Sequence, residues 1–142
     1  MKLDRDSARS RFASARVARL ATVDDTVGDG QPHAVPVTFA AEGDQVFMVV
    51  DAKPKSSRDL KRLRNIRAHP RVCLLADHYE EDWQALWWVR ADGVAEIIEE
   101  EAARAAPVRL LARKYPQYRT DAPTGQVIAV AVERWVGWTA ST

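Results

Sequence analysis

The sequence lacks several features that define whole classes of protein. It has one cysteine in 142 residues, Cys73, so no internal disulfide can form and a reducing, cytoplasmic location is expected. No apolar run approaches the roughly 20 residues that a membrane-spanning helix needs. The N-terminal stretch has no uninterrupted apolar segment typical of a secretory signal. We therefore expect no membrane span and no secretion.

Familiar catalytic and metal-binding motifs are missing as well. The chain contains no Gly-x-Ser-x-Gly, no HExxH and no CxxC pattern. The acidic stretch DHYEEDW, residues 77–83, combines His78 with four carboxylates, but it has no second histidine or cysteine beside it. We interpret it as a hydrated loop, and we predict no metal site and assign no catalytic residue.

What the sequence does have is a strong local excess of positive charge. Length and composition fit one compact domain spanning residues 1–142, with a net charge of +1. Between Lys53 and Arg71, however, eight basic residues accompany one acid, which gives +7 there and leaves −6 elsewhere. Such an asymmetry indicates an anionic partner.

The basic stretch lies where a strand is expected to give way to a helix. In VVDAKPKSSRDLKRLRN, residues 49–65, Ser56 or Ser57 can cap a helix that runs to about Ala68. Backbone N–H groups at that helix start, together with Lys53 and Lys55, would form a phosphate site. A solvated basic face and a nucleic-acid site stay open as alternatives. The acidic remainder and the compact patch disfavour nucleic acid.

Apolar alternation and turn residues predict six strands and three helices. The strands are expected at residues 17–23, 33–40, 45–50, 71–78, 86–98 and 126–138. The first helix is capped by Asp4 or Asp6, the second follows the basic stretch, and the third spans 99–115 with an interruption near Pro107. Short turns predict that the first three strands form an antiparallel meander. The pattern favours a small α+β barrel, closed or nearly so.

A few residues carry more specific predictions. Pro36 inside a strand indicates a sheet edge, a bulge or a docking place, and Gly93 indicates a bulge. Trp87 and Trp88 are neighbours on a strand, so they face opposite ways. The exposed one requires cover from packing, a second subunit or a planar ligand. His33 begins a strand that could line a pocket.

The order of these segments resembles the split-barrel flavoprotein superfamily of pyridoxamine phosphate oxidases, from about Arg19 to Trp138. The element L…RNI…HPRV, Leu60 to Val72, and WWVRADG carry its most specific part. They are most similar to the actinobacterial branch that uses the deazaflavin coenzyme F420 instead of FMN. The resemblance implies a mainly β, α+β fold with a six-stranded antiparallel split barrel and flanking helices. It also implies a homodimer with its cofactor at the subunit interface.

The resemblance assigns cofactor contacts position by position. Lys55, Ser56 and Ser57, with Lys53 nearby, would form the phosphate-binding turn. On the exposed face of the following helix, Lys61, Arg62 and Asn65 would meet phosphate or the acidic oligoglutamate tail of F420. The remaining expected contacts are with the ring or ribityl chain (Val35, Pro36, Val50, Asp51) and with the partner subunit's cofactor (Trp87 or Trp88).

The chain departs from the phosphate oxidases in two places. KPKSSRD does not reproduce the spacing of their flavin-phosphate motif, and the ending VGWTAST lacks their Trp-to-Arg pair that grips pyridoxal phosphate. The resemblance therefore implies an F420-dependent reductase that transfers a hydride to an activated double bond of a small molecule. An FMN-dependent oxidase or reductase of the same fold, and a non-catalytic cofactor carrier, are the alternatives.

Overall fold

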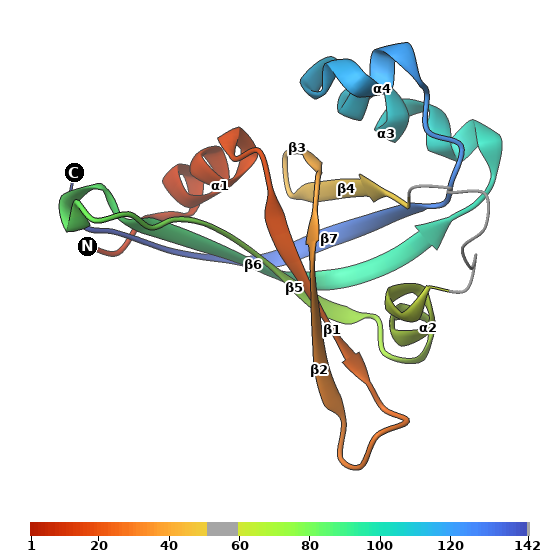
Figure 1. The fold of residues 1–142 in the computed structure, drawn as a ribbon, viewed down its shortest axis with the longest axis horizontal. Coiled ribbons are helices and arrows are strands. Elements are labelled where there is room, and N and C mark those ends of the chain that lie inside the picture. The colour runs from red at the N-terminus through yellow and green to blue at the C-terminus, as the bar shows by residue number, and fades with distance from the viewer. Residues whose placement is uncertain (51–59, 142) are drawn as a thin grey trace.

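An antiparallel sheet forms the body of the protein, and its strands cross one another steeply (Figure 1). The computed structural model describes residues 1–50 and 60–141. The strands are β1 (Ala18–Asp24), β2 (Gln31–Val37), β3 (Ala40–Glu42), β4 (Gln45–Val49), β5 (Arg71–His78), β6 (Trp87–Ile98) and β7 (Val127–Thr139). Their order in the sheet is β2-β1-β5-β6-β7-β4-β3, and each neighbouring pair is antiparallel.

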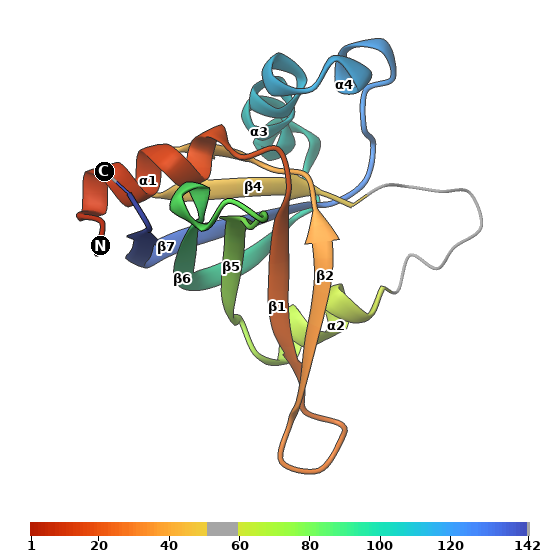
Figure 2. The same ribbon diagram turned by 60° about the vertical axis from the view of Figure 1, so that its left-hand side comes forward.

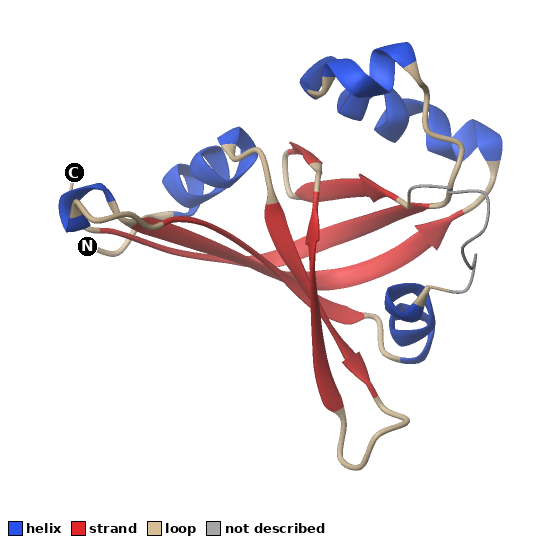
Figure 3. Ribbon diagram, in the orientation of Figure 1, coloured by secondary structure: helices blue, strands red, loops and turns tan. Residues whose placement is uncertain are grey.

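Helices lie at both sides of the crossing strands (Figure 3). They are α1 (Arg5–Ser14), α2 (Lys61–Ala68), α3 (Glu101–Lys114), α4 (Pro116–Thr120) and the short 3-10 helix η1 (Trp83–Ala85). Helix α1 packs on β6 and β7, α2 on β1 and β6, and α3 on β3 and β4. The Asp4 carboxylate accepts a 2.8 Å hydrogen bond from the Ser7 N–H, which confirms the predicted cap of α1.

The sheet has seven strands and does not close, so the predictions of six strands and of a closed barrel were wrong. One expected strand, 33–40, is divided at Thr38 and Phe39. The Phe39 N–H donates to the hydroxyl of Tyr115 at 3.1 Å, and the Thr38 hydroxyl lies 2.9 Å from that of Tyr118. These contacts with Tyr115, which lies between α3 and α4, and with Tyr118 of α4 turn the chain away from β2. β3 and β4 then join the opposite edge of the sheet, so the predicted meander was also wrong.

The larger of the two hydrophobic clusters in the described residues packs on one face of the sheet. It combines Phe12 of α1 and Leu63 of α2 with alternate residues of the strands, such as Leu20, Leu74 and Val89. All five side chains are fully buried. Burying a side chain of this size stabilises the fold by about 1.5–3 kcal/mol. The core therefore holds α1 and α2 against the same face of the sheet.

Two glycines mark places where backbone segments touch. The register of β6 on β7 shifts between Asp92 and Gly93, which confirms the predicted bulge. A Cβ at Gly93 would lie 2.3 Å from the Ala131 carbonyl oxygen, and one at Gly125 only 1.9 Å from that of Val50. Both positions therefore require glycine for close packing.

Two predicted helix features were wrong. α2 begins at Lys61 with Leu60 as its N-cap residue, later than the start after Ser56 or Ser57 that the sequence predicted, and Leu60 makes no side-chain capping hydrogen bond. α3 continues without interruption through Pro107 and ends at Lys114, just before Pro116. In the described residues, no helix is long and apolar enough to cross a membrane.

Candidate functional site

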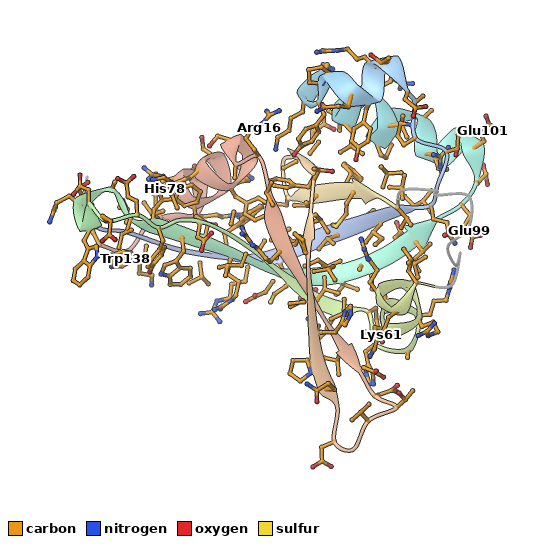
Figure 4. The ribbon with its side chains drawn as sticks, viewed as in Figure 1. Arg16, Lys61, His78, Glu99, Glu101 and Trp138 are labelled. Carbon is orange, nitrogen blue, oxygen red and sulfur yellow. The ribbon has the colours of Figure 1, made fainter. Side chains whose placement is uncertain are left out.

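Helix α2 is attached to β1 by polar as well as apolar contacts. The Asn65 side-chain amide donates to the Thr22 hydroxyl at 3.0 Å, and the Lys61 ammonium lies 2.9 Å from the Asp24 carboxylate. Figure 4 shows Lys61 where α2 faces the β1–β2 hairpin. Thr22, Asp24 and Asn65 are only 3–5% exposed. Because buried polar groups need partners, these contacts fix how α2 sits on β1.

Asp24 is held in its charged form by its neighbours. The Thr26 hydroxyl and backbone N–H donate to its carboxylate at 2.6 and 3.0 Å. The Thr26 hydroxyl, and next the Lys61 ammonium, keep the pKa of Asp24 well below its ordinary range. The negative charge of Asp24 therefore balances the positive charge of Lys61.

Asn65 does not lie on an exposed face, and this part of the sequence-based prediction was wrong. It sits one turn of helix after Lys61, so both residues point toward β1. Arg62 belongs to another side of α2. The structure thus gives Asn65 a role in positioning α2 on β1.

Part of the basic excess is paired with acids from distant parts of the chain. Beyond Lys61, Arg67 lies 3.7 Å from Glu99 and Arg71 lies 2.9 Å from Glu133. Arg62 differs. It is half-buried, its burial lowers its pKa, and within the described residues it makes no ion pair or hydrogen bond. A partly desolvated guanidinium of this kind is suited to binding an anion.

Strand β2 carries residues with two different orientations. Val35 is half-buried and packs against the core, whereas Pro36 is exposed and lies opposite Arg19. β2 is an edge strand, as Pro36 predicted. His33 points to the same side as Val35, and its Nδ1 is buried without a hydrogen-bond partner.

Trp87 and Trp88 face opposite sides of β6, as predicted. Trp87 packs against the core, with the Arg11 guanidinium 5.5 Å from its ring centre, and it lines a pocket of about 640 Å³ against α1. Trp88 lines a different pocket of about 550 Å³ on the other face of the sheet. Each tryptophan therefore borders a space of its own.

The pocket at Trp88 is the centre of what we call the outer face. Its lining comes from β1, β2, β5, β6 and the loop after β5: Arg19, Ala21, Ala34, Cys73, Leu75, Asp77, Tyr79, Trp88 and Arg90. Arg19 pairs with Asp77 at 3.6 Å, and Arg90 with Asp92 at 2.8 Å. Burial, and then Asp92, raise the pKa of the half-buried Cys73 thiol, so it stays protonated.

The predicted cofactor residues do not gather at one place. Val35, Lys61, Arg62 and Asn65 belong to the β1–β2–α2 region, and Pro36 and Trp88 to the opposite face of the sheet. Trp87 packs against the core beside α1. Val50 is buried at the end of β4, where its N–H donates to the Gln126 carbonyl at 2.8 Å. The others lie outside the described residues: Asp51, Lys53, Lys55, Ser56 and Ser57.

Sequence reasoning missed the polar wall that Thr22 and Asp24 provide for α2. The sequence did contain a signal for it. Side chains alternate between the two faces of a strand, so Thr22 and Asp24 lie on the same inward face of β1 as Leu20.

Comparison with known proteins gives a consistent family and fold. A family model described as Pyridoxamine 5'-phosphate oxidase matches residues 5–139. A similar structure is an FAD-binding protein from Mesorhizobium loti, with a TM-score of 0.74 and 19% identity, covering 96% of this chain and 95% of that one. A conserved hypothetical protein from Mycobacterium tuberculosis gives 0.77 and 22%, covering 97% and 86%. An FAD binding protein from Mycobacterium smegmatis gives 0.67 and 19%, covering 97% of both chains.

No curated protein matches the sequence. At these identities the structures show the fold alone.

Proposed function

Because this chain belongs to the pyridoxamine 5'-phosphate oxidase family of split-barrel proteins, we propose that it is an F420-dependent oxidoreductase acting on a small molecule. The observation that carries the proposal is Arg62, a half-buried cation without an ion pair in the described part of the chain. It stands in a segment whose charge exceeds that of a single phosphate. F420 offers a phosphate and several tail carboxylates.

In this proposal, described residues would contact the cofactor at both of its ends. Arg62 would bind phosphate or a tail carboxylate, and Val35 would pack on the tricyclic ring. Lys61 would act chiefly by holding α2 in place, because Asp24 already neutralises it. The bound cofactor would supply hydride transfer to an activated double bond, while the protein binds, orients and shields the reacting groups.

A flavin is the alternative ligand, and the FAD-binding descriptions of the Mesorhizobium and M. smegmatis proteins favour it. The test is to titrate the protein with F420, FMN and FAD while following tryptophan fluorescence. We expect the tightest binding with F420. Binding of a flavin but not of F420 would replace the proposal by a flavin-dependent enzyme. Binding of F420 with no turnover on a panel of activated alkenes would favour the carrier.

Arg62 provides the sharper form of this test. Arg62→Ala should weaken F420 binding about tenfold and make the remaining affinity less sensitive to salt, because a charge-assisted contact is lost. The control is Arg109→Ala, which removes the same charge from an exposed position on α3. Equal effects of the two variants would mean that only overall charge matters.

We also propose that two copies of the chain pair through the outer face. Ala21, Ala34 and Leu75 give this face an apolar centre beside Trp88. The charged groups at its rim are already paired within the chain. Burying them in an interface would therefore leave no unpaired buried charge. In such a dimer Trp88 would reach toward the partner's cofactor.

The dimer proposal is tested by mass measurement during gel filtration. Trp88→Glu should convert a dimer into a monomer, because a carboxylate would be buried in an apolar contact. Trp83→Glu is the matched control, since Trp83 is 73% exposed on η1 and does not line this pocket. A monomeric wild-type protein, or a dimer insensitive to Trp88→Glu, would refute the proposed interface.

A further inference from the structure

His33 is unusual among the residues that the structure describes. Its Nδ1 is the one side-chain nitrogen or oxygen atom there that is buried and lacks a hydrogen-bond partner. Buried polar atoms in native proteins are nearly always paired, because an unpaired one loses its hydration without compensation. An orphaned atom of this kind points to a partner that binds from outside the chain.

The surroundings of His33 indicate where that partner would lie. In the sheet register His33 stands opposite Thr22, whose hydroxyl already accepts the Asn65 amide. Val35 follows two residues later on the same side of β2. His33 is therefore placed between the contact of α2 with the sheet and the half-buried Val35.

We propose that His33 Nδ1 forms a hydrogen bond with a hydroxyl group of the ribityl chain of the bound cofactor. This inference rests on the proposed function, in which α2 holds the anionic end and Val35 contacts the ring. The ribityl chain joins these two ends in F420 and in FMN alike. A hydroxyl both donates and accepts, so it can pair with Nδ1 in either imidazole tautomer.

The test compares four variants of the full-length protein by cofactor affinity and by the melting temperature of the ligand-free form. His33→Leu removes the polar atom and should weaken binding about tenfold, as expected for one lost hydrogen bond. The ligand-free melting temperature should stay equal or rise, because the variant no longer buries an unpaired atom. A residue with a merely structural role would instead lower the melting temperature.

Amide substitutions locate the responsible atom. Asparagine can put its Oδ1 near the position of Nδ1, so His33→Asn should keep binding within about threefold of wild type. Glutamine reaches toward the Nε2 position instead, and His33→Gln should lose about tenfold. The comparison of His33→Asn with His33→Gln tests the proposal even if His33→Leu does not fold. His78→Leu is the control, because His78 is exposed and pairs with Glu80.

The outcomes separate this inference from the proposed function. Wild-type protein that binds neither F420 nor a flavin overturns both. Wild-type binding with unchanged affinity in His33→Leu, or with equal losses in the Asn and Gln variants, overturns the role of His33 alone.

Discussion

Two lysines attach helices to the rest of the protein, and they do so in opposite ways. Lys61 of α2 faces the Asp24 carboxylate at 2.9 Å. Lys114, at the end of α3, has no carboxylate partner in the described part of the chain. Its ammonium donates to the carbonyls of Ala13 and Ala15 at 3.2 and 2.6 Å and lies 3.8 Å from the centre of the Phe39 ring. Burial, and then Arg16, lower the pKa of Lys114 to about 8.

A bound anion can therefore affect how α2 is attached to the sheet, but it cannot reach the attachment of α3. The charge of Lys61 is balanced by a carboxylate within a basic surface, beside the half-buried Arg62. Lys114 is enclosed by carbonyls and aromatic rings, which satisfy its hydrogens but do not neutralise its charge. We therefore expect ligand binding to respond to changes at α2, and stability alone to respond to changes at α3.

The largest effects are expected from removing one buried hydrogen-bonding side chain at each attachment. Asn65→Ala leaves the Thr22 hydroxyl unpaired. Tyr115→Phe removes the hydroxyl that donates to the Arg16 carbonyl at 2.8 Å and accepts from the Phe39 N–H. Each should lower the free energy of unfolding by about 1–3 kcal/mol in urea denaturation. Only Asn65→Ala should also weaken cofactor binding. Equal losses of affinity in both variants would remove the distinction between the helices.

A smaller effect is expected from the pH dependence of stability. Because the folded protein lowers the pKa of Lys114 from 10.5 to about 8, the unfolded chain binds more protons between these values. Stability should therefore rise as pH increases from about 8, by about 1–2 kcal/mol once the partial exposure of the amine is taken into account.

Lys114→Met isolates that contribution, because it keeps the apolar stem and removes the titrating group. Chemical denaturation of wild type and variant between pH 7 and about 9.5 should show a rise only in wild type. An equal rise in both proteins would assign the effect to other groups.

The smallest effect on stability is expected at Lys61, because its side chain is 43% exposed. Lys61→Met leaves Asp24 with both hydrogen bonds from Thr26, so the free energy of unfolding should fall less than in Asn65→Ala. Urea denaturation of the two variants under one condition makes the comparison. A greater loss in Lys61→Met would show that the ion pair, and not the Asn65–Thr22 contact, holds α2.

Lowering the pH should weaken the attachment of α2 to β1, because that attachment depends on the charged form of Asp24. The pKa of Asp24 is lowered in the folded state, so its contribution to stability is complete above the ordinary aspartate range and declines as the carboxylate is protonated in acid.

Features determined by near neighbours in the chain could be predicted from the sequence. The Asp4 cap needs only three residues of context, and the opposite faces of Trp87 and Trp88 follow from the geometry of any strand. The bulge at Gly93 follows from a glycine inside a long strand. The family resemblance added the split-barrel fold, which local patterns alone left at a small barrel.

Features determined by distant contacts could not be predicted in the same way. The chain leaves β2 at Thr38 and Phe39 because Tyr115 and Tyr118, some 80 residues later, bind it there. Likewise, α2 turns Asn65 inward because Thr22 offers a hydroxyl. Helical spacing could group Lys61 with Asn65, but it could not show which side of the helix would meet β1.

The open edge at β2 has a consequence for how the protein avoids aggregation. Pro32 and Pro36 lack a backbone N–H, and in a paired strand such positions are those turned away from the neighbour, here β1. Along this stretch Ala34 alone can donate outward. Figure 2 shows how far the β1–β2 hairpin extends from the rest of the molecule. A foreign strand that approached this edge would find too few donors to continue the ladder, so edge-to-edge growth into fibrils is disfavoured.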